Sequence, residues 1–211
     1  AMLPVVAAAG GARPDAGSAL ALTLAIAAEA SIGVLLGLLA QLVFGAVTMA
    51  GELAGVQMGL GLIGLIDPQS HDRVVALAQW QNALALLLFL AIDGHHALIQ
   101  ALAESFRRVP VGGAALTGAA LGMALAFAGE LFVLALKLAA PVLVLVLMTN
   151  ACMGALAKLI PQLNVMVVGF PINVAAGFFI LAAAQPFTLR LLEGAFARTG
   201  AVLGGVVAAL V

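Results

Sequence analysis

Long stretches without any charged side chain are the feature that most constrains this chain. Between Ala30 and Ala50 no acidic or basic residue occurs. As a helix this stretch would be about 32 Å long, which is enough to cross the hydrocarbon core of a bilayer. Only 8% of all residues are charged, whereas a soluble domain has about 25% charged residues. We therefore expect an integral membrane protein, or a subunit whose apolar surface other subunits cover.

Interruptions of the apolar pattern predict an all-α protein with four to six helices, several of them broken, and no strands. Loops or turns are expected where polar, glycine or proline residues gather, at Gly10–Ser18, Asp67–Arg73, Asp93–His96, Val109–Gly113 and Lys158–Asn164. Pro141 is expected to kink or restart a helix, and Gly169-Phe170-Pro171 to break another.

The stretch Gly51–Arg73, GELAGVQMGLGLIGLIDPQSHDR, is unusually rich in glycine for an apolar segment. Each glycine costs about 1 kcal/mol relative to alanine within a helix, and Asp67-Pro68 is a strong stop signal. Two interpretations of Gly59–Ile66 remain open. Its aliphatic side chains on a bendable backbone suit a hydrophobic constriction in a conduit. They equally suit a tightly packed helix pair that uses small residues at the contact.

Four ionisable residues lie within apolar runs: Glu29, Glu52, Glu130 and Lys137. Charges inside a membrane mark ion pathways or paired groups. An independent ion- or proton-coupled transporter would use Glu52 beside the glycine-rich break. We favour salt bridges within the chain or to another subunit. Glu130 and Lys137 are seven residues apart, too far for a normal direct pair, so each is expected to meet a different group.

The sequence predicts neither an enzyme nor a cofactor-binding protein. The chain has no HExxH, no GxSxG and no phosphate-binding Gly-Lys-Ser/Thr loop. Asp93, His95 and His96 are the best candidates for metal ligands. However, consecutive histidines in a helix point about 100° apart and rarely ligate together. We expect a polar cluster at a helix end and no metal site.

Two further classes of chemistry are not expected from the composition. The net charge is −1 and the eight basic residues are scattered, so no face is suited to a nucleic acid. The single cysteine, Cys152, lies between apolar residues and is expected to be a buried, inert thiol.

Three sequence blocks carry a resemblance to a known family. GELAGVQMGLGLIGLIDPQS, LLLFLAIDGHHALIQALAESFRRVPVG and LALKLAAPVLVLVLMTNACMGALAKLIPQLNVMVVGFPINVAAG occur in this order between about Ala19 and Leu192. In order and spacing they resemble the FliR family of flagellar type III export-gate subunits. Related injectisome subunits share the general pattern, but the blocks around Gln57 and Pro161 look more like the flagellar branch.

The resemblance implies a subunit of the export gate in the bacterial inner membrane, at the flagellar basal body. In this family kinked helical hairpins, in contact with membrane lipid, wind into a helical assembly with FliP and FliQ that also contacts FlhB. The assembly is a passage for unfolded flagellar proteins, and the subunit itself is not an enzyme.

The resemblance also implies a plug, carried over to Met58–Val75. Its aliphatic seal would be Leu60, Leu62, Ile63, Leu65 and Ile66, with Asp67 and Pro68 turning the loop after Met58. Subunit contacts or buried charges would fall on Glu52, Gln57, Glu130, Lys137 and Lys158.

Two departures from the family pattern accompany this resemblance. The N-terminal helical hairpin of the family has no counterpart here, so residues 1–211 are expected to be a single FliR-like domain, truncated or shortened. The phenylalanines usual in the plug are replaced by Ile63, Ile66 or nearby aliphatic residues, which implies a less bulky seal.

Overall fold

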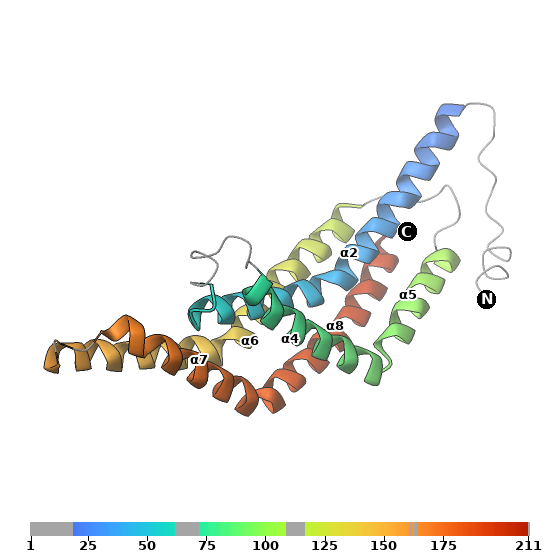
Figure 1. Cartoon of the computed structure of the whole chain (residues 1–211). Helices are drawn as coiled ribbons and strands as arrows, with labels where there is room; N and C mark the ends of the chain where they lie inside the picture. The colour runs from blue at the N-terminus through green and yellow to red at the C-terminus, as the bar shows by residue number, and fades with distance from the viewer. Residues whose placement is uncertain (1–18, 62–71, 109–116, 161, 163, 211) are drawn as a thin grey trace. The chain divides into compact units, whose positions relative to one another are not determined.

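The computed structural model describes residues 19–61, 72–108, 117–160, 162 and 164–210. These residues form six helices and no strand, so the predicted all-α fold is confirmed. The helices, labelled in Figure 1, are α2 (Ala19–Gln57), α4 (Asp72–Ala91), α5 (Gly94–Arg108), α6 (Gly118–Leu159), α7 (Val165–Ala183) and α8 (Gln185–Ala209).

Three of the described helices are long and apolar enough to cross a membrane: Ile26–Gln57 of α2, α6 and α8. Helices α4 and α5 would be a fourth, broken span, because the chain bends by 68° between Ala76–Ala91 and Gly94–Arg108. The membrane-protein class predicted from the charge-free stretches is therefore confirmed.

Prolines interrupt the described helices less than the sequence predicted. Helix α6 continues through Pro141 without restarting, and α7 continues through Pro171. The predicted break at Gly169-Phe170-Pro171 is wrong. A proline removes one backbone donor, and in a helix held by packing along its length the remaining hydrogen bonds suffice. The predicted loop before α7 is confirmed, since Asn164 caps that helix by accepting a hydrogen bond from the Val167 amide at 3.3 Å.

The chain falls into two compact units, and each is assembled from segments far apart in sequence. Unit 1 contains Ala1–Val43, Phe89–Leu131 and Glu193–Val211. Unit 2 contains Phe44–Leu88 and Phe132–Leu192. Helices α2, α4, α6 and α8 therefore each contribute residues to both units.

Unit 1 has an apolar core that includes Leu39, Phe127 and Val206, and polar and aromatic side chains join its segments as well. The Thr117 hydroxyl donates to the Ala209 carbonyl at 2.6 Å and accepts from the Ala120 amide at 3.2 Å. It thereby caps the start of α6 and links it to the end of α8. The rings of Phe89 and Phe196 pack at 5.1 Å between centroids.

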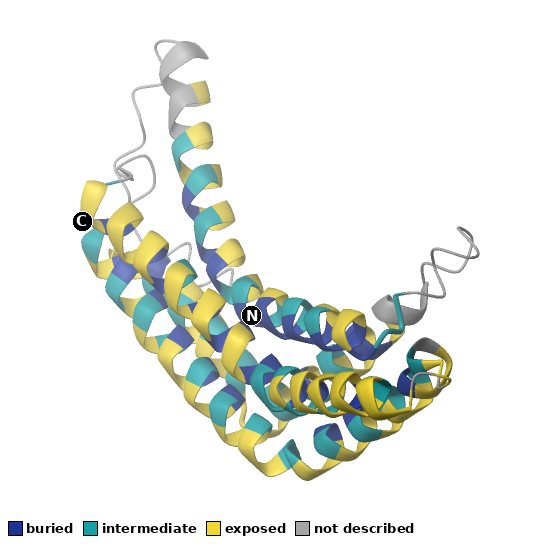
Figure 2. Ribbon diagram, turned by 90° about the vertical axis from the view of Figure 1, so that its left-hand side faces the viewer, coloured by how far each residue is buried: buried dark blue, intermediate teal, exposed yellow. Residues whose placement is uncertain are grey.

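Unit 2 has its core where α2, α4, α6 and α7 meet. The buried side chains in this cluster are Ala54, Met58, Leu77, Val142, Val146 and Leu181. Helices α6 and α7 are also joined by a hydrogen bond of 2.8 Å, which the side-chain nitrogen Nδ2 of Asn173 donates to the side-chain oxygen Oδ1 of Asn150. Along most of the described helices buried positions alternate with exposed ones (Figure 2), so these helices bury a stripe and leave an apolar face uncovered, whereas in α5 the buried residue is Ser105.

Candidate functional site

The end of α2 lies inside the glycine-rich stretch and has the geometry of a tight helix terminator. The Leu60 amide donates to the Gly55 carbonyl and the Gly59 amide donates to the Val56 carbonyl, both at 3.0 Å. Gly59 has φ 86°, in the left-handed region. This combination is a Schellman motif, in which glycine is favoured because a Cβ would be strained. Helix α2 is thus stopped sharply at Gly59 rather than at Asp67-Pro68.

Met58 is the last residue before this turn and is fully buried. It packs into the unit 2 core, and Leu60 is partly buried against the same cluster. Of the eight residues predicted to form a plug, these are the two that the structure describes. The other six lie outside the described residues: Leu62, Ile63, Leu65, Ile66, Asp67 and Pro68.

Helix α2 approaches α4 closely through a second glycine. A Cβ added to Gly51 would lie 2.6 Å from the Cα atom of Ala78 and 2.8 Å from the Gln81 side-chain oxygen. The two backbones can come this close because glycine has no side chain. Gly51 was predicted to weaken the helix, yet α2 continues through it, and the close approach supplies the packing that offsets its low helix propensity.

The ionisable residues within apolar runs have different surroundings. Glu130 pairs with Arg198 of α8 at 2.7 Å within unit 1. This confirms the prediction that Glu130 meets a group other than Lys137. Lys137 instead lies on an apolar groove of about 480 Å³ in unit 2. Its neighbours there are Ala140, Pro141, Val144, Leu145, Met148, Ile180 and Phe187. Glu130 and Lys137 therefore do not pair with each other and have different neighbours.

The remaining predicted contact residues are exposed. Glu52 and Gln57 lie on the surface of α2, and Lys158 lies in the last turn of α6. At that position its positive charge is favourable to the helix dipole. Among the described residues no ion pair reaches Glu52, Lys137 or Lys158. Cys152 is also exposed on α6, so its expected burial is wrong. Of its two apolar neighbours Met153 is buried and Ala151 is exposed, so Cys152 lies on the uncovered side of α6.

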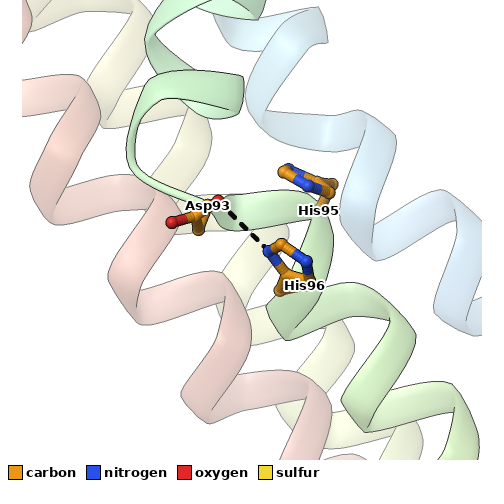
Figure 3. Close-up of side chains that lie close together, drawn as sticks. All are labelled: Asp93, His95 and His96. Carbon is orange, nitrogen blue, oxygen red and sulfur yellow. Dashed lines mark hydrogen bonds and ion pairs between the residues drawn. The ribbon is translucent and has the colours of Figure 1, made fainter.

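Asp93, His95 and His96 gather at the turn between α4 and α5 (Figure 3). Asp93 has φ 56°, and its carboxylate lies 3.1 Å from His96 Nδ1. The two imidazole rings are 4.2 Å apart between centroids, and Nδ1 of His95 is buried without a hydrogen-bond partner. The expectation that the two histidines diverge is therefore wrong, because an imidazole is long enough to turn back toward its neighbour.

The three residues are grouped closely enough to be candidate metal ligands. One possible ligand atom from each lies within 4.8 Å of the others. The Asp93 carboxylate is bonded to His96, and the His96 amide donates to the Asp93 carbonyl at 2.9 Å. In this arrangement the cluster stabilises the turn at the start of α5.

Several residues that organise the described part of the chain were not singled out from the sequence. Gly177 of α7 lies against Met58, Arg198 is the partner of Glu130, and Thr117 links α6 to α8. Thr117 had a recognisable signal, since a threonine before a helical run is a common N-cap. Gly177 stands in the apolar run Val174–Phe178, where a small residue suggests helix packing.

The folded arrangement defines a class: an all-helical membrane protein that leaves long apolar faces uncovered. A family model described as bacterial export proteins, family 1, matches residues 1–199. The flagellar biosynthetic protein FliR of Escherichia coli (strain K12) is 39% identical over 180 residues, which cover 85% of this chain and 69% of that protein. The FliR proteins of Pectobacterium carotovorum subsp. carotovorum (39% over 180 residues; 85% and 69%) and Bacillus subtilis (strain 168; 31% over 175 residues; 81% and 67%) are also similar.

The chain belongs to this family of bacterial export proteins, the FliR family. Its role is therefore that of a membrane subunit of the flagellar protein export apparatus. These relatives do not favour the independent ion-coupled transporter that the charges within apolar runs had left open.

Proposed function

We propose that this chain is a non-enzymatic subunit of an export gate in the bacterial inner membrane, at the flagellar basal body. It packs beside FliP and FliQ subunits, contacts FlhB, and lines part of the passage for unfolded flagellar proteins. The segment Met58–Val75 starts at the end of α2 and plugs this passage when no substrate is present.

The observation that carries the proposal is the abrupt end of α2. The Schellman motif at Gly59 releases the chain from the helix at a defined point. The aliphatic segment Gly59–Ile66 begins at this point, and such side chains exclude water and ions from a narrow passage. The turn therefore starts the plug at the same place in every copy of the subunit.

Uncovered apolar faces support an assembly with other membrane subunits. Leu125, Leu147 and Phe179 are each at least 70% exposed, and large exposed apolar patches mark membrane or protein contacts. Lys137 and Glu52 lie on such surfaces without an ion pair among the described residues. A charge at membrane depth needs a partner, and a neighbouring subunit supplies one more readily than lipid tails do.

The test is to shorten Gly59–Ile66 in the co-expressed complex and to measure ion leakage across the membrane. We expect increased leakage with unchanged co-purification of the subunits. A matched variant replaces the same residues by glycine and serine at constant length. It distinguishes the effect of losing the aliphatic side chains from the effect of shortening the segment. Unchanged permeability of both variants in an intact complex would show that the segment is not a plug.

The transporter alternative makes a different prediction. Purified chain alone would carry ions in liposomes and lose this activity on Glu52→Gln. The export-gate proposal expects no such activity from the chain alone.

A further inference from the structure

Helix α7 has a notch at Gly177 that the side chain of Met58 fills. A Cβ added to Gly177 would lie 2.5 Å from Cγ of Met58 and 2.7 Å from both its Sδ and Cε atoms. Real Cβ atoms do not approach other atoms this closely, so alanine could not occupy position 177 without displacing the methionine. The thioether side chain thus lies directly on the backbone of α7.

Met58 is held from several sides at once. It is 0% exposed, and the buried cluster around it contains Ala54 from its own helix, Leu77 from α4, Val142 from α6 and Leu181 from α7. Methionine is unbranched and adapts to irregular gaps, which suits a notch between helices. A side chain in contact on all sides moves only if the core around it opens.

This contact lies immediately before the turn that ends α2. The Met58 amide still donates to the Ala54 carbonyl at 2.9 Å, whereas the next residue, Gly59, has left-handed φ. Leu60, after the turn, is partly buried against the same cluster. The chain is thus held on both sides of Gly59.

We propose that Met58 and Gly177 are a positioning pair that fixes the starting point of the plug. This inference rests on the proposed plug function and changes one part of it. Met58 is an anchor that stays in the core, and it neither lines the passage nor moves with the segment that follows. Gly177, which lies far from the plug in sequence, is as important for its placement as the plug residues themselves.

The first experiment compares single and double variants in the complete complex. Gly177→Ala is expected to raise ion leakage severalfold at unchanged complex yield, because the displaced methionine shifts the end of α2. Met58→Ala combined with Gly177→Ala is expected to leak less than Gly177→Ala alone, because the added Cβ then has room. The matched control is Gly154→Ala, since a Cβ at that exposed glycine of α6 would meet nothing within 4 Å.

The outcomes distinguish an anchor from general packing. Leakage of Gly177→Ala no greater than that of Gly154→Ala would overturn the inference, as would a double variant that leaks as much as the single one. If shortening Gly59–Ile66 causes leakage while Gly177→Ala does not, only the positioning pair fails. If shortening causes no leakage, the plug itself fails.

A second experiment applies even if Gly177→Ala prevents assembly. Cys152 is the only cysteine, so a Cys152→Ala background can carry the pair Met58→Cys and Gly177→Cys. Because Cβ and Cγ of Met58 are one bond apart, the two Cβ atoms would be at most about 4 Å apart, which suits a disulfide. We expect oxidation to form the crosslink and protein export to continue. Failure to crosslink, or export that stops on oxidation and returns on reduction, would contradict a fixed anchor.

Discussion

Units 1 and 2 are built from pieces of the same helices but hold those pieces together differently. In unit 2 two glycines are in close contact with other residues: Gly51 with Ala78 and Gly177 with Met58. In unit 1 the comparable contact among the described glycines is local, between Gly94 and the ring of Phe89 five residues earlier, whereas the glycines at 33, 37, 122 and 129 have nothing within 4 Å of an added Cβ. Its segments pack through buried side chains such as Leu39 and Val206, and they are also linked by the Thr117–Ala209 hydrogen bond and the Glu130–Arg198 pair.

This difference teaches where each unit is sensitive to change. At Gly51 an added carbon atom would meet the Ala78 backbone and force the two helices apart, whereas at Gly177 it would meet the Met58 side chain, which must be displaced within its core. A polar link between exposed side chains can rearrange or be replaced by water, and its loss costs little. Unit 2, which contains the start of the proposed plug, therefore has the helix contact that is least tolerant of an added side-chain atom.

Substitution of Gly51 should have the largest effect and is the strongest test of this comparison. Gly51→Ala is expected to lower the free energy of unfolding by about 1–3 kcal/mol, because the new Cβ meets the Ala78 backbone. Gly45→Ala in the same helix is the control, since its added Cβ meets nothing within 4 Å. It should be neutral or stabilise by up to about 1 kcal/mol. The measurement is unfolding in mixed detergent micelles, and equal effects of the two changes would break the comparison.

Substitution of Asp93 in unit 1 should have the next largest effect on stability, because of the backbone conformation at this residue. Its φ of 56° suits glycine, asparagine or aspartate but not a β-branched residue. Asp93→Val should destabilise the protein by about 1–2 kcal/mol. Asp93→Gly removes the strain together with the bond to His96 and should be much milder. Melting temperatures of the two variants check the order, and a Val variant as stable as the Gly variant would contradict the described turn.

Thr117 tests the polar links of unit 1 directly. Thr117→Val keeps the shape but removes both the cap on the Ala120 amide and the bond to the Ala209 carbonyl. A loss of about 1 kcal/mol is expected from the cap. Thr117→Ser keeps the hydroxyl and should retain most of the stability. Destabilisation by Ser but not by Val would mean that the methyl group, rather than the hydroxyl, is what matters.

The Glu130–Arg198 pair should have the smallest effect. Its side chains are 45% and 62% exposed, respectively, and exposed ion pairs contribute about 0–1 kcal/mol. Glu130→Gln should therefore change the free energy of unfolding only slightly, and the exchange Glu130→Arg with Arg198→Glu should restore it. A loss of about 3 kcal/mol or more would indicate that the pair is desolvated and would place the comparison in doubt.

The sequence predicted those features that depend on local pattern. The charge-free runs predicted apolar helices, and the loop before Val165 and the turn at Asp93 lie where polar residues interrupt those runs. Contacts between segments that are distant in sequence have no local sequence pattern that would predict them. Nothing near Glu130 in sequence indicates Arg198, which lies 68 residues away. Continuity through Pro141 and Pro171 also depends on packing along α6 and α7, which local propensity does not contain.

The candidate site was predicted in outline but not in its details. The density of glycine marked the stretch after Gly51 as unusual, and the family resemblance placed a plug there. The role of each glycine depended on its surroundings: Gly51 lets two helices approach, whereas Gly59 ends one of them. Met58 looked like the first residue of the plug because sequence alone does not reveal that it lies in a core with α6 and α7.

The division of α2, α4, α6 and α8 between two units has a consequence for biosynthesis. Unit 2 extends to Leu192, and unit 1 requires Glu193–Val211 as well. The Thr117–Ala209 hydrogen bond, for example, joins residues that are 92 positions apart in sequence. Neither unit can close until the ribosome has made most of the chain, so the early apolar helices must wait for partners from the last one. During that interval they depend on the membrane, or on neighbouring subunits, to escape aggregation.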